Sequence, residues 1–153
     1  MGVTVGVNSL SVVHKGSNGI TTAFPDVCKT PSPGGPIPIP YPNIAMSSDT
    51  AQGSKKVKCD GNAICLENSN FKMSTGDEAG SAGGGVVSNK IKGKAEFVNF
   101  SFDVKVEGKG VARAFDLMLH NDKNTPPFPL LQGPVVPIPG PQRRICYICD
   151  KDF

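Results

Sequence analysis

The chain has 153 residues and a formal net charge of +3, a length that fits one domain with its own apolar core. Its 18 glycines and 14 prolines exclude a helix-rich fold, because inside a helix glycine costs about 1 kcal/mol and proline about 3 kcal/mol. No run of about 18 apolar residues is present, which argues against a membrane anchor. The N-terminal MGVTVGVNSLSVVHKG alternates and lacks the basic start and apolar centre of a secretory signal peptide.

Residues 30–45, TPSPGGPIPIPYPNIA, carry proline at every second position from Pro36 to Pro42. In an extended strand, the N–H groups of residues two apart point to the same edge, so these prolines remove every donor from one edge. We therefore predict a strand that pairs on one side only and whose outer edge resists edge-to-edge association. A polyproline II linker is the alternative, and it is less favoured because the intervening apolar residues prefer burial. The structural motif consists of Pro36, Pro38, Pro40, Tyr41, Pro42 and Asn43.

The middle of the chain, residues 43–125, contains no proline and is free to form hydrogen-bonded ladders. KKVKCDGNAICLE is predicted to form a hairpin around Asp60-Gly61-Asn62, and residues 95–119 are predicted to form two strands joined at residues 107–110. Phe100, Phe102, Val104 and Val106 alternate with polar residues, which predicts one buried and one wet face. We expect an all-β fold built from short hairpins, with extended proline-rich segments and little or no helix.

Nothing in the sequence indicates an enzyme or a nucleic-acid-binding protein. Lys55, Lys56 and Lys58 form the densest basic group, but no aromatic residues are interleaved with them, so a solvated strand face is favoured. GDEAGSAGGGVVSNK lacks the Gly-Lys-Ser/Thr ending of a phosphate loop. Its carboxylates, Asp77 and Glu78, are expected on an exposed loop, where burial does not tune a pKa.

A zinc site is the better prospect, since zinc binds four Cys or His ligands that converge from separate segments. His14, Cys28 and His120 each lie beside turn-forming residues and are the candidate ligands. Cys146 and Cys149 form a CxxC without a second CxxC, which leaves metal, a disulfide and free thiols as alternatives. Cys59 and Cys65 flank the hairpin turn and are interpreted first as core or surface thiols.

Three segments in order resemble the PAAR-like domains of type VI secretion systems, the group marked by a PIPYPN signature. They are FPDVCKTPSPGGPIPIPYPNIAMSSDT, STGDEAG and LMLHN, and the resemblance runs from about Val3 to Pro129. It implies a small cone whose base sits on the blunt end of the trimeric VgrG spike. It also implies one zinc ion near the apex, carried over onto His14, Cys28 and His120 with a fourth ligand unidentified.

The resemblance divides the chain into a spike-tip domain, residues 1–129, and a proline-rich extended tail with the CxxC, residues 130–153. The expected function is a non-catalytic tip that caps and sharpens the spike and helps to load or deliver effector cargo. Such a protein resides in the bacterial cytoplasm before firing and is then delivered outside or into a target cell. The alternatives are the N-terminal delivery domain of a longer toxin, and a secreted polypeptide-binding module unrelated to a spike.

Overall fold

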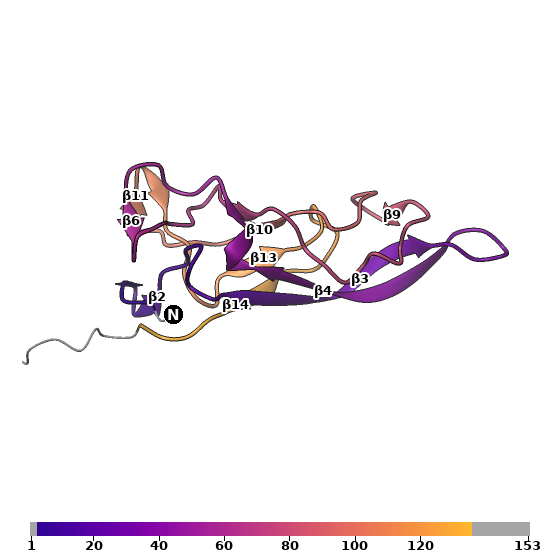
Figure 1. Cartoon of the computed structure of the whole chain (residues 1–153), viewed down its shortest axis with the longest axis horizontal. Coiled ribbons are helices and arrows are strands. Elements are labelled where there is room, and N and C mark those ends of the chain that lie inside the picture. The colour runs from indigo at the N-terminus through magenta and orange to yellow at the C-terminus, as the bar shows by residue number, and fades with distance from the viewer. Residues whose placement is uncertain (1–2, 136–153) are drawn as a thin grey trace, which may run out of the picture.

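A computed structural model describes residues 3–135, which form an elongated body of strands and turns. The body is wide where several small hairpins cluster and narrows toward one long hairpin (Figure 1). The single helical element in this range is a 3-10 turn, η1 (Ser47–Asp49). The expected all-β, hairpin-built cone is confirmed. No helix within residues 3–135 is long and apolar enough to cross a membrane.

Three two-stranded hairpins form the wide end and one eight-stranded sheet forms the rest. The hairpins pair β1 (Gly6–Val7) with β2 (Leu10–Ser11), β6 (Lys58–Cys59) with β7 (Asn62–Ala63), and β11 (Lys105–Val106) with β12 (Lys109–Gly110). The sheet runs, in spatial order, through β4 (Ile37–Met46), β3 (Ile20–Thr30), β14 (Phe128–Leu131), β13 (Leu117–Leu119), β10 (Ala95–Phe97), β8 (Asn70–Phe71) and β5 (Thr50–Ala51), with β9 (Gly84–Gly85) also paired to β3.

The proline-alternating segment is strand β4, and it pairs with β3 along its whole length. Ile37, Ile39 and Tyr41 lie opposite Thr30, Cys28 and Asp26. The positions without prolines therefore carry the donors that face β3. The outer edge regains a donor after the last proline, where the Ile44 N–H bonds to the Thr75 carbonyl at 2.7 Å.

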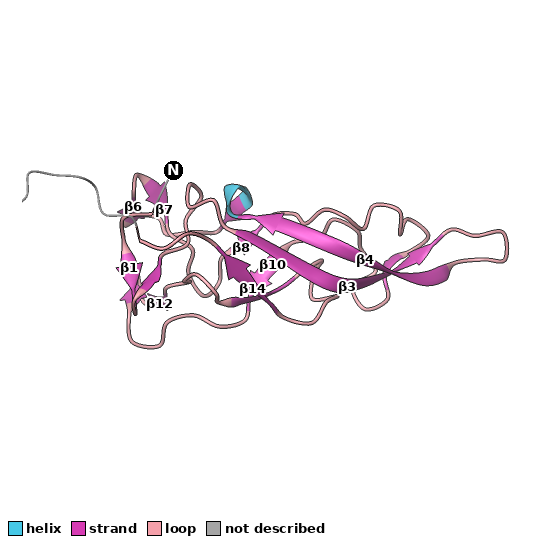
Figure 2. Ribbon diagram, turned by 90° about the horizontal axis from the view of Figure 1, so that it is seen from below, coloured by secondary structure: helices cyan, strands magenta, loops and turns pink. Residues whose placement is uncertain are grey.

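The burial expected for the residues between the prolines is corrected by the structure. Ile37 is 45% exposed, and Ile39 and Tyr41 are half-buried. The β3–β4 hairpin extends beyond the body as a two-stranded arm with no second layer over its end (Figure 2). The hydroxyls of Tyr41 and Thr30 hydrogen-bond at 2.6 Å across this arm.

The predicted apolar face of residues 100–106 is corrected in part: Val104 and Val106 pack against an apolar cluster, but Phe102 does not join them. Ser101 is fully buried, whereas Phe102 is 84% exposed. Residues 101–104 bend instead of continuing a strand, because the Ser101 hydroxyl donates to Asn8 and Asp103 and accepts the Val104 N–H. Local hydrogen bonding thus outweighs the alternating pattern.

Two small apolar clusters fill the interior, as the modest aromatic content leads one to expect. In the first, Phe71 and Phe97 meet edge to face with ring centroids 5.7 Å apart, and Met118 and Leu130 pack with them. The second lies under the three hairpins and consists of Val7, Val12, Cys59, Ile64, Leu66 and Val111. Cys59 and Cys65 are buried free thiols, in agreement with their interpretation as thiols of the core.

Candidate functional site

The wide end, called the base from here on, is a three-fold repeat of one backbone unit, found at residues 3–17, 55–69 and 102–116. Each unit contains a hairpin with a two-residue turn in the left-handed region, where the favoured hairpin turns place both central residues. These turn pairs are Asn8 and Ser9, Asp60 and Gly61, and Glu107 and Gly108, with φ between 50° and 80°.

The three units are joined in a closed ring of backbone hydrogen bonds. The N–H of Val13 donates to Ala112, that of Ala112 to Cys65, and that of Cys65 back to Val13, at 3.2, 3.0 and 2.8 Å. All three residues are fully buried. The ring is flanked by three equivalent β-bridges, Val12 with Arg113, His14 with Ile64, and Leu66 with Val111. A pseudo-three-fold axis therefore passes through the wide end.

The turn that follows each bridge is closed in the same way. A side-chain oxygen three residues further along accepts the N–H of His14, Leu66 and Arg113, respectively. The acceptors are Ser17, Ser69 and Asp116, and each returns its own N–H to the same residue's carbonyl. These side-chain caps accept backbone N–H groups that take no part in the hydrogen bonds of the ring.

Sequence reasoning found the second and third hairpins but missed the hairpin at Asn8 and Ser9, and with it the repeat. The three units are related by shifts of 52 and 47 residues along the chain, and their side chains differ at most positions. The repeat has a sequence pattern: a two-residue turn, three further residues, a small buried residue, and then a Ser or Asp that caps the next turn. A search for this pattern would have detected the repeat.

Among the described residues, the ligand atoms of His14, Cys28 and His120 do not form one group within 4.8 Å of one another. His14 belongs to the base: its Nε2 donates to Asp60 at 3.1 Å, and its Nδ1 accepts the Gly16 N–H at 3.1 Å. Cys28 lies on β3, opposite Gly85 of β9. His120 follows β13 and places its Nε2 3.0 Å from the Thr21 hydroxyl. The CxxC of Cys146 and Cys149 lies outside the described residues.

Within residues 3–135, one group of His, Cys, Asp and Glu ligand atoms gathers within 4.8 Å, and it consists of Asp26, Cys28 and Asp77. All three side chains are fully buried. This corrects the expectation of an exposed Asp77. The Lys92 N–H donates to Asp77 at 3.0 Å.

Side-chain amides surround the buried carboxylate of Asp26. Asn43 donates to it at 2.9 Å, Asn121 at 3.4 Å, and Asn124 through a shorter contact. The Asn43 amide also donates to the Ser74 hydroxyl at 2.8 Å. Residues of the PIPYPN, STGDEAG and LMLHN segments thus meet at one point.

The electrostatics of this acidic cluster favour a bound cation. Burial, with the nearby charges of Asp26 and Asp77, raises the pKa of the Cys28 thiol to about 12. Burial likewise raises the pKa of Asp77, and Asp26 raises it further. Without a cation, the cluster holds its thiol protonated and disfavours two ionised carboxylates; a divalent ion relieves both penalties.

Two buried polar atoms have no hydrogen-bond partner among the described residues, Asn43 Oδ1 and His120 Nδ1. Burial lowers the pKa of His120 to about 4, so the ring is neutral at pH 7, the form in which imidazole binds metals. The donor set of two carboxylates and a thiol fits zinc, which accepts oxygen and sulfur ligands, whereas His120 lies outside the group whose ligand atoms are within 4.8 Å of one another.

The glycines of the STGDEAG loop allow it to cover the cluster. A Cβ on Gly80 would lie 2.2 Å from the Cβ of Cys28. Gly76 has φ of +130°, and a Cβ there would lie 2.1 Å from the Pro42 carbonyl oxygen. The loop is therefore a closely packed lid rather than an open anion-binding loop.

The segments that meet at the cluster lie within the part of the chain that matches a known protein family. A family model described as toxin PAAR-like domain matches residues 19–127. The chain is also 41% identical over 144 residues to a Pseudomonas aeruginosa protein named DNase toxin Tse7. That match covers 87% of this chain and 37% of the relative, so the chain spans well under half the relative's length. No solved structure matches. With most of its length matched by the family model, the chain belongs to the toxin PAAR-like domain family of type VI secretion systems.

Proposed function

We propose that this chain is a non-catalytic tip that seats its wide end on the blunt end of a VgrG trimer and is delivered with the spike. The observation that carries the proposal is the closed ring of Val13, Cys65 and Ala112, with its three equivalent hairpins. A single chain docking on a three-fold partner needs three similar surfaces arranged around one axis. The base offers them, and the arm of β3 and β4 tapers away at the opposite end (Figure 1).

Binding to the spike trimer tests this orientation. A short Gly-Ser insertion after Gly108, in a hairpin turn of the base, should abolish co-elution with the purified trimer. The same insertion after Gly34, in the loop of the arm, should leave co-elution unchanged. The two positions are matched, because no atom lies within 4 Å of a Cβ built on either glycine. Equal binding by both variants would place the interface elsewhere.

The acidic cluster is proposed to hold one zinc ion through Asp26, Cys28 and Asp77, with His120 as the candidate fourth ligand. Bound there, zinc would supply a structural crosslink rather than a reactive centre. It would tie β3, at the root of the arm, to the loop that carries Asp77. A thin two-stranded arm has little apolar core to resist bending, so such a crosslink would stiffen the tip.

Metal analysis of the purified chain tests this assignment. The proposal predicts one zinc per chain, lost in Cys28→Ser and retained in Cys59→Ser, which alters a buried thiol outside the cluster. Absence of zinc from wild-type protein, after purification without chelator, would rule the site out.

A nuclease is the second candidate function, because the similar Pseudomonas protein is named a DNase toxin. The buried carboxylates of the cluster do not favour it, since a phosphodiester needs open access to a catalytic metal. Asp26 and Asp77 are fully buried beneath the glycine loop. Zinc-loaded chain should leave plasmid DNA intact, and cleavage abolished by Asp26→Asn would overturn the non-catalytic proposal.

Delivery has its own readout. Before firing, the chain should remain in the bacterial cytoplasm. It should appear outside the cell only when the type VI sheath contracts, so a sheath-deficient strain should retain it.

A further inference from the structure

We propose that the pocket between the second and third repeats of the base binds a carboxylate side chain of the protein on which the base seats. The inference rests on the proposed function and deepens it, because it assigns a chemistry to one of three pseudo-equivalent grooves.

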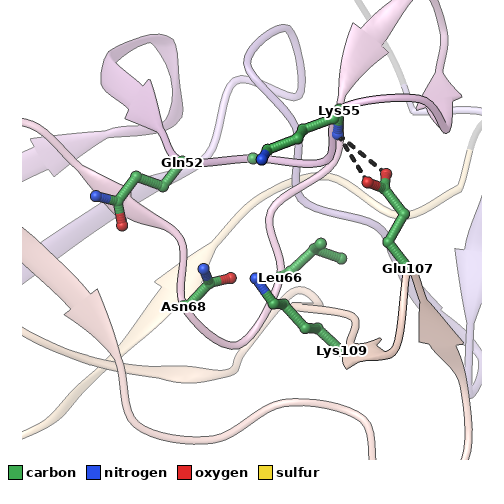
Figure 3. A pocket seen from close by; sticks show the side chains of 7 residues that line it. Gln52, Lys55, Leu66, Asn68, Glu107 and Lys109 are labelled. Carbon is green, nitrogen blue, oxygen red and sulfur yellow. Dashed lines mark hydrogen bonds between the residues drawn. The ribbon is translucent and has the colours of Figure 1, made fainter.

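The pocket is a hollow of about 520 Å³ between the second and third hairpins. Lys55 and Lys109 reach toward its centre from opposite sides, with the amides of Gln52 and Asn68 at one side and Leu66 at the floor (Figure 3). Neither lysine forms an ion pair with another residue in the range 3–135. Two ammonium groups are therefore available to one ligand.

The acidic residue at the rim, Glu107, does not neutralise this pair directly. Its carboxylate accepts the backbone N–H groups of Lys55, Lys56 and Val57, at 3.0 to 3.3 Å through Oε2. Glu107 thus fixes the loop that presents Lys55 and is drawn away from the pocket centre (Figure 3).

The other two grooves between repeats differ in chemistry. Between the third and first repeats, Leu10 and Phe115 take the positions of Lys109 and Asn68. These two apolar side chains line the hollow there in place of a lysine and an amide. Between the first and second repeats, Gly16 packs against Asn62, with a built Cβ only 2.9 Å from the amide nitrogen. The backbone is three-fold, but only one groove of the described base is both open and cationic.

A carboxylate fits this pocket better than a nucleic acid. No aromatic side chain lines it to stack on a base. An Asp or Glu side chain can place its stem on Leu66 and its oxygens between the two ammonium groups.

The test compares two double variants that remove the same charge. Lys55→Ala/Lys109→Ala empties the pocket of cations, whereas Lys72→Ala/Lys92→Ala removes two exposed lysines that lie outside the three repeats of the base and do not line the pocket. Affinity for the purified VgrG trimer from the same genome is measured by biolayer interferometry at low and at high sodium chloride. Melting curves confirm that both variants fold.

We expect the pocket variant to bind about tenfold more weakly at low salt, through slower association and faster dissociation. Its affinity should also depend less on salt than that of wild type, while the control stays within about twofold of wild type. Equal affinity of the pocket variant and wild type overturns the pocket alone, as does an equal loss in the control. A wild-type chain that fails to bind the trimer overturns the proposed function, and the pocket inference with it.

Discussion

Replacing Asp77 by Asn separates a metal site from a metal-free acidic cluster, because the two predict opposite changes in stability. The substitution keeps the shape of the side chain. Its amide oxygen can still accept the Lys92 N–H that bonds Asp77 at 3.0 Å, and its amide nitrogen can donate to Asp26. If no metal binds, the amide imitates a protonated Asp77 and removes the repulsion that raises the pKa of this carboxyl. The metal-free protein should then be as stable as wild type or more so.

If zinc binds, Asp77→Asn removes a ligand. A ligand present at about 100 times its dissociation constant stabilises the native state by about 2.7 kcal/mol. For a domain of this size each kcal/mol corresponds to about 3 °C, so loss of zinc should lower the Tm by about 8 °C. Calorimetry at pH 8, with zinc and with chelator, measures the difference. Glu78→Gln is the control, because Glu78 is the exposed neighbouring carboxylate. A variant that keeps its zinc and melts at or above the wild-type temperature would refute the metal assignment.

Three further variants test the packing and the strand edge. Gly80→Ala should lower the free energy of unfolding by about 1–3 kcal/mol, because its Cβ meets Cys28. The control Gly34→Ala meets nothing within 4 Å and should stay within about 0.5 kcal/mol of wild type. Equal denaturation midpoints for the two variants would show that the lid is not closely packed. Ser69→Ala leaves the buried Leu66 N–H without its 2.7 Å acceptor and should cost about 1–3 kcal/mol in urea unfolding, against no change for the exposed Ser81→Ala. Pro38→Ala/Pro40→Ala restores two N–H donors to the outer edge of β4 and should promote association, seen by light scattering; a monomeric variant would contradict the role of the prolines, and Pro33→Ala in the loop is the control.

The proline strand shows what could be read from the sequence alone. Loss of the N–H is a property of each proline, so the one-sided pairing of Pro38 and Pro40 follows without tertiary information. Burial is not such a property. Ile37 is exposed because the arm extends past the body, and nothing local in the sequence specifies that length.

The acidic cluster could be predicted only in part. Cys28 was identified, but its partners Asp26 and Asp77 were not, because an aspartate ordinarily faces solvent. Their burial depends on amides from Asn43, Asn121 and Asn124, which lie 17, 95 and 98 positions from Asp26 in the chain. Contacts of such separation are set by the topology of the sheet.

The repeat of the base escaped detection for another reason. Val13, Cys65 and Ala112 meet through their backbone groups, and backbone hydrogen bonds place little demand on side-chain identity. A buried valine, cysteine and alanine can therefore occupy equivalent positions without a visible sequence pattern.

Native mass spectrometry of the chain mixed with a VgrG trimer tests the central claim most directly. A pseudo-three-fold base that seats on the axis of the spike predicts a single complex of three VgrG chains and one copy of this chain, even when the chain is in excess. A complex with three copies per trimer would contradict the account, because it would place the binding surface on one side of the chain instead of around the ring of Val13, Cys65 and Ala112.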